Sequence, residues 1–400
     1  MKKIVLIIIT LPIGLVSCKR EALLKQNETF SQNKKKETSQ TLATTTYNVT
    51  TSTTLNAAFW TNVQSSLQTG PVDVVFANGT YTRTSTVSLG SIGHNTNLLT
   101  LKAAGTAGGA VFNGSVAKIF AFTNCKNILM HGLKFTGDVT DYAVTFSNSP
   151  NITIDSCYFV DLQSAYYGAL GVHYSGSDNV IVKHCTFTRV GVDSHSHMVY
   201  GAYGVTRLKL VKNTFTDCSG SFVRFRGDIS TEGVVYENTF KSNGTYAGGV
   251  NPIFIEIPVF NDVNPGDERF GTSFMITKNI FNFSTSGDQS TRYNVVFHHS
   301  GYNPTGRTHL ISATDAATLN SGTVTQKRAI MSSDLGLDGD EIRFSGNTNT
   351  NVQYNVLYRC QGGYGAVAPW TGIASIGTAV TTAGVATTEA AALAYYDDRH

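Results

Sequence analysis

Short segments in which apolar and polar residues alternate recur through the middle of the chain, between residues 127 and 281. They read NILMHGLKF, NITIDSCYF, NVIVKHCTF, RLKLVKNTF, GVVYENTF and SFMITKNIF. In the fourth segment, for example, the polar Lys209 separates Leu208 from Leu210. A period of two residues is typical of a β-strand that buries one face, because successive side chains point to opposite sides. The pattern therefore predicts many short, half-buried strands.

The segments also form a repeat. Aligned on their last aromatic residue, they superimpose Phe135, Phe159, Phe187, Phe215, Phe240 and Phe281, with spacings of 24, 28, 28, 25 and 41 residues. A weaker copy, NVQYNVLY, places Leu357 in the same column. Two positions earlier stands a second column, formed by Leu133, Cys157, Cys185, Asn213, Asn238, Asn279 and Asn355. Stacked asparagine amides hydrogen-bond from one copy to the next.

A near-constant period of 24 to 28 residues with several short strands in each copy predicts stacked coils. The fold expected is all-β, a single-domain right-handed parallel β-helix over residues 46–400. A β-sandwich, the alternative, explains neither the two columns nor the period.

Both ends of the repeat carry helical patterns. Residues 54–67 place Leu55, Phe59, Val63 and Leu67 on one helical face, and we expect this helix to cap the N-terminal end of the solenoid. Residues 388–396, TEAAALAYY, predict a short C-terminal helix. The longest spacing includes an insertion, residues 258–272, which we expect to overhang one side.

The N-terminus predicts an export signal. Two lysines precede the apolar run Ile4–Val16, which is too short and too broken by Pro12 and Gly14 for a membrane span. The run ends in Leu-Val-Ser-Cys18, which resembles the bacterial lipoprotein lipobox. Residues 1–17 are thus expected to be a lipoprotein signal peptide, with Cys18 lipidated; an ordinary signal peptide is the alternative. The polar residues 18–45 predict a flexible tether. The expected location is the bacterial cell envelope, on the periplasmic or the outer side, with membrane contact through the anchor only.

Composition narrows the class of protein. Only 14% of residues are charged and 38 are glycine, which disfavours a helix-rich enzyme or a coiled coil. A hydrophobic fraction of 41% is enough for a large core. The net charge of +3 is too small to indicate nucleic-acid binding, although an anionic ligand fits it. Five cysteines remain after Cys18, with no CxxC pair, so neither a zinc site nor a disulfide framework is indicated. No segment predicts a protein partner, and we expect a monomer.

The repeat brings a polar cluster together. Registering Phe187 on Phe215 places His173 beside Gly201, and registering Phe215 on Phe240 places Gly201 beside Arg226. If Val223 and Phe225 point inward, Arg224 and Arg226 point outward together. The next coils offer Glu256 and then His298 and His299, and the strand around Gly201 adds His195, His197, Tyr200 and Tyr203. Strict alternation from Gly201 turns Tyr200 inward unless a bulge intervenes.

Two other interpretations of this cluster are an ordinary solvent-exposed face and a metal site. Outer faces of any solenoid carry polar residues, and an Arg beside a Glu is often only a surface ion pair. His195 and His197, two positions apart on a strand, are spaced for a metal site with His173 or Glu256 as third ligand. Because His, Arg and Tyr side chains converge on adjacent coils, we expect a binding groove without a metal.

Two stretches resemble polysaccharide lyases of the alginate lyase and chondroitinase B type. They are LLTLKAAGTAGGAVFNGS followed by KNILMHGLKFTGD, and NTFTDCSGSFVRFRGD, within a resemblance that spans residues 75–250. The resemblance implies that Arg226 is the catalytic arginine. Those enzymes place a lysine base and calcium-binding acidic residues slightly earlier, where this chain has SHSHMVYGAYGV. Tyr203 lies near the lysine position and His197 near a calcium ligand, so the use of calcium is left open.

The same residues suit a β-elimination. This reaction requires a cation for the uronate carboxylate, a base for the C5 proton and an acid for the leaving O4. Arg226, with Arg224 or a protonated histidine, is expected to bind the carboxylate. The expected catalytic residues are His197, Arg226, Tyr203 and Tyr200, and the expected substrate-binding residues are His173, His195, Arg224, Glu256, His298 and His299.

The function expected is a lyase of an anionic uronate polymer, with alginate (poly-mannuronate) favoured over glycosaminoglycans or ulvan. One alternative is a glycoside hydrolase on the same scaffold, which requires two carboxylic acids across the scissile bond. Glu256 would then pair with Asp228, Asp193 or Glu232. Another alternative is a lipoprotein that binds glycans without cleaving them, because a fold does not imply an activity.

Overall fold

The computed structural model describes residues 42–226, 230–243, 246, 253–259, 271, 273–284, 292–299, 326, 342–352, 354–360, 372–375 and 385–395. Those from Thr44 onward belong to one compact unit. The expected signal peptide, Cys18, nearly all of the tether, Asp228 and most of the insertion at 258–272 lie outside the described residues. Within these ranges, no helix is both long enough and apolar enough to cross a membrane.

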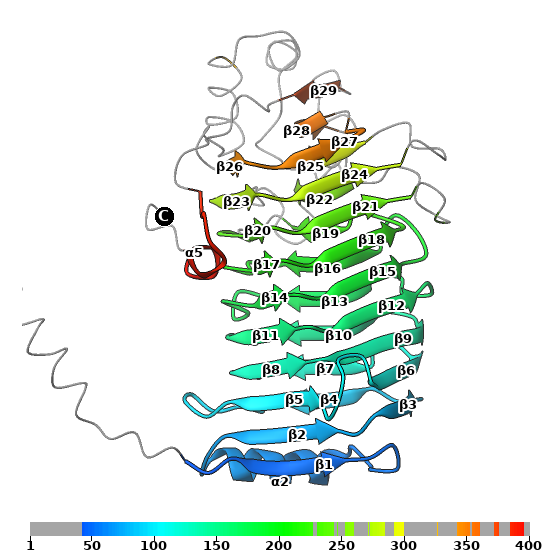
Figure 1. Ribbon diagram of the computed structural model, residues 1–400, viewed down its shortest axis with the longest axis vertical. Helices are drawn as coiled ribbons and strands as arrows, with labels where there is room; N and C mark the ends of the chain where they lie inside the picture. The colour runs from blue at the N-terminus through cyan, green and yellow to red at the C-terminus, as the bar shows by residue number, and fades with distance from the viewer. Residues whose placement is uncertain are drawn as a thin grey trace, which may run out of the picture. The chain divides into compact units, whose positions relative to one another are not determined.

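Each coil contributes one strand to each of three sheets, here named A, B and C, and neighbouring coils pair in parallel (Figure 1). Sheet A contains β1 (Thr45–Val49), β2 (Val72–Phe76), β5 (Leu99–Ala103), β8 (Ile128–His131), β11 (Ile152–Asp155), β14 (Ile181–Lys183), β17 (Lys209–Val211), β20 (Val234–Tyr236), β23 (Phe274–Thr277) and β26 (Ile342–Ser345). Sheet B contains β3 (Gly79–Arg83), β6 (Ala110–Val116), β9 (Leu133–Val139), β12 (Tyr158–Leu162), β15 (Thr186–Val190), β18 (Thr214–Cys218), β21 (Thr239–Ser242), β24 (Ile280–Phe283) and β27 (Thr348–Thr350).

Sheet C carries the polar cluster. It contains β4 (Val87–Gly90), β7 (Phe120–Thr123), β10 (Tyr142–Ser147), β13 (Gly168–His173), β16 (His197–Ala202), β19 (Val223–Phe225), β22 (Ile253–Val259), β25 (Tyr293–His299), β28 (Tyr354–Cys360) and β29 (Gly372–Ser375). Its last pair, β28 with β29, is antiparallel, whereas the other pairs of described strands are parallel. The chain thus folds as a parallel β-helix, as the repeat predicts.

The aromatic column is confirmed, and it forms the centre of sheet B's inner face. Phe135, Phe159, Phe187, Phe215, Phe240 and Phe281 are all fully buried. Successive rings stack with centroids 5.0, 4.7, 4.9, 4.8 and 5.1 Å apart. Burying one phenylalanine side chain stabilises a fold by roughly 1.5–3 kcal/mol, so this column is a main contribution to the core.

The asparagine ladder is confirmed for three members and corrected at its end. Asn213 donates to Asn238 over 3.0 Å, Asn238 to Asn279 over 3.1 Å, and Asn279 to Asn347 over 3.0 Å. The last member is Asn347, so the placement of Asn355 and Leu357 in these columns is wrong. NVQYNVLY lies in β28 of sheet C, and Phe281 pairs with Asn349. The ladder follows a left-handed bend, which Lys278 and Gly346 occupy (φ 57° and 65°), and NVQYNVLY does not supply that bend.

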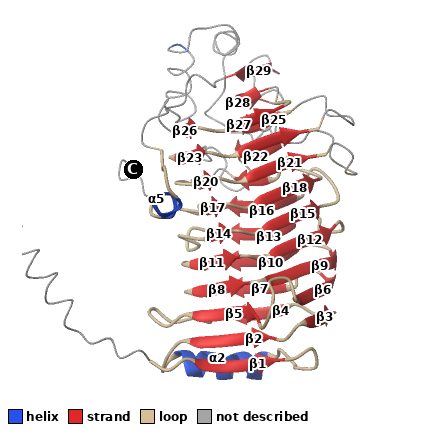
Figure 2. Ribbon diagram, in the orientation of Figure 1, coloured by secondary structure: helices blue, strands red, loops and turns tan. Residues whose placement is uncertain are grey.

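The two predicted terminal helices are present (Figure 2). Helix α2 (Ala57–Leu67) begins after Asn56, whose side chain accepts a hydrogen bond from Phe59 N, and it lies against the first coil beside β1. It buries Trp60, Val63 and Leu67, and Phe59 is partly buried against the same core, so Trp60 joins the predicted inward face. Helix α5 (Glu389–Leu393), capped by Thr388, is shorter than the predicted C-terminal helix and packs on the outer face of sheet A.

Candidate functional site on the outer face of sheet C

The register of sheet C differs by one residue from the sequence prediction. Gly201 pairs with Val172 rather than His173, and with Phe225 rather than Arg226. The prediction counted back from the phenylalanine that follows each sheet C strand, but the length of chain between them varies by one residue. Val172 precedes Phe187 by 15 residues and Phe225 precedes Phe240 by 15, whereas Gly201 precedes Phe215 by 14.

The corrected register turns Tyr200 outward. A side chain at Gly201 would meet the core residue Leu208, so Gly201 faces inward and its neighbour Tyr200 faces the outside. The expectation that Tyr200 faces inward is therefore wrong. A bulge precedes it, because the N–H groups of Met198 and Val199 both donate to the carbonyl of Phe222. The bulge sends Met198 and Val199 to the core and places His197 on the outer side with Tyr200.

The two arginines lie as predicted. Val223 and Phe225 belong to the core, while Arg224 and Arg226 alternate with them on the outer side. The outward row runs from Tyr200 to Arg224 and then to Glu256 on three adjacent coils. Tyr200, Arg224 and Glu256 thus lie on one face of sheet C, although two of the predicted pairings are displaced by one residue.

Arg224 and Glu256 form a nearly buried ion pair. Arg224 donates to Glu256 Oε2 from Nε over 2.7 Å and from a terminal nitrogen over 2.6 Å. Ser221 Oγ donates to the same oxygen over 2.9 Å. Since three hydrogen bonds converge on one oxygen of Glu256, the carboxylate and Arg224 hold each other in place.

His197 extends this network. Its Nδ1 lies 3.0 Å from Ser221 O and 2.9 Å from Ser221 Oγ. Because a carbonyl only accepts, Nδ1 carries the proton and Nε2 the lone pair. Burial, and then the charge of Arg224, lowers the pKa of His197 well below its ordinary value, so the ring is neutral at neutral pH. The neutral ring stacks on Tyr200 with centroids 5.3 Å apart.

Arg226 joins two tyrosines. One guanidinium nitrogen lies 3.3 Å from Tyr200 Oη and 3.4 Å from Tyr203 Oη, and the guanidinium carbon lies 5.1 Å from the centre of the Tyr203 ring. The backbone N–H of Arg226 donates to Gly201 O over 2.8 Å. Burial, and then Tyr200, raises the pKa of Tyr203 against the opposing charge of Arg226, so Tyr203 keeps its proton at neutral pH.

His173 packs among the tyrosines. Its ring centre lies 5.4 Å from Tyr142, 5.8 Å from Tyr200 and 6.0 Å from Tyr203. Burial, and then the charge of Lys118, lowers the pKa of His173 to about 4. Neither His173 nor His197 is therefore charged at neutral pH, which removes the predicted alternative of a protonated histidine beside Arg226.

The remaining predicted residues lie at the edges of the cluster. His195 is exposed and stacks on Tyr166 with ring centres 5.4 Å apart, and its Nδ1 lies 3.3 Å from Asp193 Oδ1. His298 and His299 pair with Pro258 and Val259 on β22, two and three positions beyond the rung of Glu256, whose partner is Val296. The side chains of His298 and His299 lie outside the described residues.

The described part of the chain contains no group of three His, Cys, Asp or Glu side chains placed to hold a metal ion. Calcium requires six to eight oxygen ligands, and the buried carboxylate of this face, Glu256, is already bound to Arg224 and Ser221. The described residues of the cluster therefore do not fit a calcium ion.

Sequence analysis missed several members of this face, namely Ser221, Tyr142, Tyr166, Tyr167 and Tyr174. The ring centre of Tyr142 lies 6.2 Å from that of Tyr200, and Tyr167 stacks on Tyr142 with ring centres 5.6 Å apart. Tyr166, Tyr167 and Tyr174 immediately precede and follow β13, and aromatic residues at both ends of one strand were the available signal.

Comparison with known proteins agrees with this fold. A family model described as a right handed beta helix region matches residues 118–256. No curated protein gives a significant match. Among solved structures, pectate lyase Pel9A is 12% identical, with a TM-score of 0.45 over 82% of this chain and 78% of that one.

Two further solved structures are similar to this chain. A mannuronic acid specific polysaccharide family 6 lyase from human gut microbiota is 13% identical, with a TM-score of 0.25 over 64% of this chain and 81% of that one. The A-module of the Azotobacter vinelandii mannuronan C-5 epimerase AlgE4 is 11% identical, with a TM-score of 0.27 over 77% and 95%. At these identities the likeness concerns the fold alone.

Proposed function

We propose that this protein is a polysaccharide lyase that cleaves a uronic-acid polymer by β-elimination, with poly-mannuronate as the favoured substrate. The observation that supports it is the position of Arg226, whose guanidinium contacts the hydroxyls of Tyr200 and Tyr203 on the outer face of sheet C. A cation and two phenols within hydrogen-bonding distance match the three roles that the reaction needs.

In the proposed reaction Arg226 binds the substrate carboxylate and stabilises the negative charge that develops when C5 loses its proton. Arg226 is only 7% exposed, and in so poorly solvated a place electrostatic interactions are strong. Tyr200 acts as the base in its phenolate form: its oxygen, which lies 3.3 Å from a guanidinium nitrogen of Arg226, takes the C5 proton. Tyr203 keeps its proton at neutral pH and donates it to O4 as the C4–O4 bond breaks and the C4–C5 double bond forms.

The surrounding residues have positioning roles. Glu256 holds Arg224 in place two positions before Arg226. His197 is oriented by Ser221 and supports the ring of Tyr200. Its neutral Nε2 remains an alternative acceptor for the C5 proton, as expected from the sequence.

A glycoside hydrolase has less support. It requires two carboxyl groups facing one another across the bond. Glu256 is bound to Arg224, Glu232 lies 4.0 Å from Arg207, and Asp193 lies beside His195. Each of these three carboxylates has its own cationic or histidine partner, and Asp228 lies outside the described residues.

The test is to incubate the purified protein with alginate blocks, chondroitin, hyaluronan, heparin and ulvan, with and without a chelator. We expect the ultraviolet absorbance of an unsaturated uronate product to rise with alginate and to be unaffected by the chelator. New reducing ends without this absorbance would establish a hydrolase instead. Binding without cleavage would establish a glycan receptor and remove the roles given to Tyr200, Tyr203 and Arg226.

For the N-terminus we propose lipidation of Cys18 and a tether to residue 45, which would hold a monomeric catalytic domain, residues 46–400, at the bacterial cell envelope. Labelling of the expressed protein with a fatty-acid probe tests this. We expect Cys18→Ser to abolish labelling and to leave the polysaccharide assay unchanged. Labelling that persists in this variant would contradict the proposal.

A further inference from the structure

The bends that follow five strands of sheet C, namely β4, β7, β10, β13 and β16, have a left-handed backbone. After β4, β7 and β10 the bend residues are Ser91, Asn124 and Asn148, with φ of 56°, 53° and 49°. After β13 and β16 they are Tyr174 and Tyr203, with φ of 72° and 63°. The backbone N–H groups of the first four residues each donate to the carbonyl of the last residue of the neighbouring sheet C strand, so these residues form one column. Tyr203 follows Ala202, which pairs with His173, and so continues the column.

Two tyrosines are costly choices for this column. Asparagine adopts the left-handed conformation readily, whereas bulky residues rarely do. Burial does not repay the cost at Tyr174, because this side chain is 48% exposed. Long side chains such as Lys212 and Lys278 also occupy left-handed bends, after strands of sheet A, so the conformation alone assigns no function. Tyr174 and Tyr203 are distinguished because aromatic rings replace Ser and Asn in this column, beside the residues proposed to react.

The two rings form a platform next to Arg226. Tyr174 stacks on Tyr203 with centroids 5.5 Å apart and planes 23° apart. Tyr203 in turn contacts Arg226 through its ring and its hydroxyl. Tyr174 therefore extends the reacting cluster outward from the end of β13 with an exposed aromatic ring.

A second platform lies at the other end of the same strand. Tyr166 and Tyr167 precede β13 and are 39% and 47% exposed. Tyr167 stacks on Tyr142 with planes 20° apart, and Tyr142 lies nearly parallel to Tyr200, with planes 16° apart. Tyr166 stacks on His195. The ring centres of Tyr167 and Tyr174 are connected through Tyr142 and His173 in steps of 5.6, 5.4 and 6.2 Å, so they lie at most about 17 Å apart, and Tyr200 packs against both connecting rings.

We propose that the two platforms are stacking subsites for pyranose rings on either side of the reacting uronate, so that the polymer lies along the direction of β13. The inference rests on the proposed function and deepens it. A pyranose ring has an apolar face of C–H groups that packs on an aromatic ring, while a carboxylate at its edge stays free to reach a cation. A chain of linked sugar rings is needed to reach both platforms at once, which favours a polymer over a monosaccharide.

The decisive variant is Tyr174→Asn, because asparagine is the residue that the neighbouring coils use in this column. We expect its melting temperature to equal or exceed that of the wild type. We expect KM for poly-mannuronate to rise about tenfold, as for the loss of one aromatic stacking interaction, with a smaller change in kcat. Tyr174→Phe keeps the ring and is expected to keep KM within about twofold. Ser91→Asn, in the same column but three coils away from Tyr174, is the matched control and should change neither quantity.

Binding is measured separately by electrophoresis through gels that contain each polymer of the panel. If the wild type eliminates no polymer but one polymer retards it and Tyr174→Asn loses that retardation, the subsite stands and the lyase proposal fails. If elimination proceeds and Tyr174→Asn keeps the wild-type KM, the subsite is wrong and the lyase stands.

Three other results would overturn the inference. One is an equal loss in Tyr174→Phe and Tyr174→Asn, because the ring would then not be the binding group. Another is a marked drop in the melting temperature of Tyr174→Asn, which would make Tyr174 structural. The third is a wild type that no polymer in the panel retards.

Discussion

The same coils form the outer faces of sheets A and C, but the side chains on these two faces have different partners. On sheet A, Val211, Val234, Tyr236 and Met275 present an apolar surface that the chain's own C-terminal segment covers with Ala386, Ala392 and Tyr395. On sheet C, Arg224 pairs with Tyr200 on one neighbouring coil and with Glu256 on the other, and exposed tyrosines lie close by.

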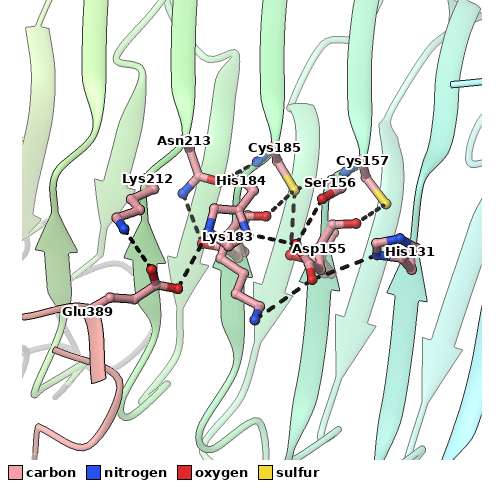
Figure 3. A network of polar contacts seen from close by, with 12 residues as sticks. His131, Asp155, Ser156, Cys157, Lys183, His184, Cys185, Lys212, Asn213 and Glu389 are labelled. Atoms are coloured by element: carbon pink, nitrogen blue, oxygen red, sulfur yellow. Dashed lines mark hydrogen bonds and ion pairs between the residues drawn. The ribbon is translucent and has the colours of Figure 1, made fainter. Parts of the chain in front are cut away.

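Polar contacts fix the segment on sheet A. Glu389 of α5 lies 2.8 Å from Lys212 and 3.5 Å from His184, and His184 lies 3.0 Å from Asp155, which Lys183 and His131 also approach (Figure 3). The nearly buried Lys209 donates a hydrogen bond to the carbonyl of Leu393, the last residue of α5.

The same stacking of coils therefore serves two purposes on these two faces. Where a segment of the same chain supplies the partner groups, a ladder of side chains stabilises the fold. On sheet C, exposed tyrosine rings lie near the nearly buried Arg226, and Tyr174 and Tyr203 have a left-handed backbone. Such a row of side chains is suited to binding a ligand. The two faces should therefore respond oppositely to substitution: sheet A in stability, and the centre of sheet C in activity.

The largest expected effect is on activity. Arg226→Lys keeps a positive charge but loses the planar guanidinium that contacts both hydroxyls, so we expect kcat/KM for elimination to fall about a thousandfold. Initial rates of product absorbance measure this. Lys212→Arg, a charge-conserving change on sheet A, is the control and should leave the rate unchanged. A rate within tenfold of the wild type for Arg226→Lys would remove it from the reacting groups.

The next effect tests stability inside sheet C. Glu256→Gln leaves Arg224 without its carboxylate in a nearly buried place, and we expect a loss of about 3–5 kcal/mol in the free energy of unfolding. Glu389→Gln breaks the half-exposed contacts to Lys212 and His184 and should cost much less. Urea denaturation of both variants gives the comparison. Equal losses would show that the two networks do not differ in burial as described.

Deletion of residues 385–400 removes the cover from sheet A. Val211, Val234 and Met275 then become exposed, and we expect the free energy of unfolding to fall by a few kcal/mol, with stronger binding of a hydrophobic dye. The kcat/KM of the remaining folded protein should stay within about twofold of the wild type, because the deleted segment touches sheet A. A selective loss of activity would instead connect the two faces.

The smallest effect concerns pH. Burial raises the pKa of Asp155, but the hydrogen bonds from His184 and Ser156 and the charge of Lys183 outweigh it and hold this pKa below its usual value. A lowered folded-state pKa gives stability that is present above the unfolded value of about 3.9 and is lost as the pH falls through the folded value. We expect Asp155→Asn to be less stable than the wild type at pH 6 and to show a shallower acid limb. Melting temperatures from pH 6 down to pH 3 measure it, and parallel acid limbs would contradict the assignment.

The sequence predicts sheet B far better than sheet C, for a physical reason. Phe187 and Phe215 stack on their own kind, and Asn213 bonds to another asparagine, so identical letters recur at the spacing of the coils. On sheet C different residues stack, as Tyr200 does beside Arg224, and the bends that lead there vary in length. The outward residues are therefore predictable as a group, whereas their pairings are not.

Two features lie beyond the reach of such patterns. The docking of α5 on sheet A joins Lys212 to Glu389 across 177 positions, and nothing in TEAAALAYY indicates which face it covers. The platform residue Tyr174 sits in a bend, where strand periodicity carries no information, and its meaning emerges only from the φ values of its neighbours in the column.

The helix at the first coil has a consequence for association between molecules. Gln64 of α2 accepts from the N–H of Gly93 over 2.8 Å and donates to the Gly93 carbonyl over 3.2 Å, so one side-chain amide takes the place of the strand that a further coil would offer. An exposed strand edge is a template on which another chain can add. Through these two bonds α2 occupies the chain edge at Gly93, where another chain could otherwise pair, and this disfavours end-to-end association of two molecules.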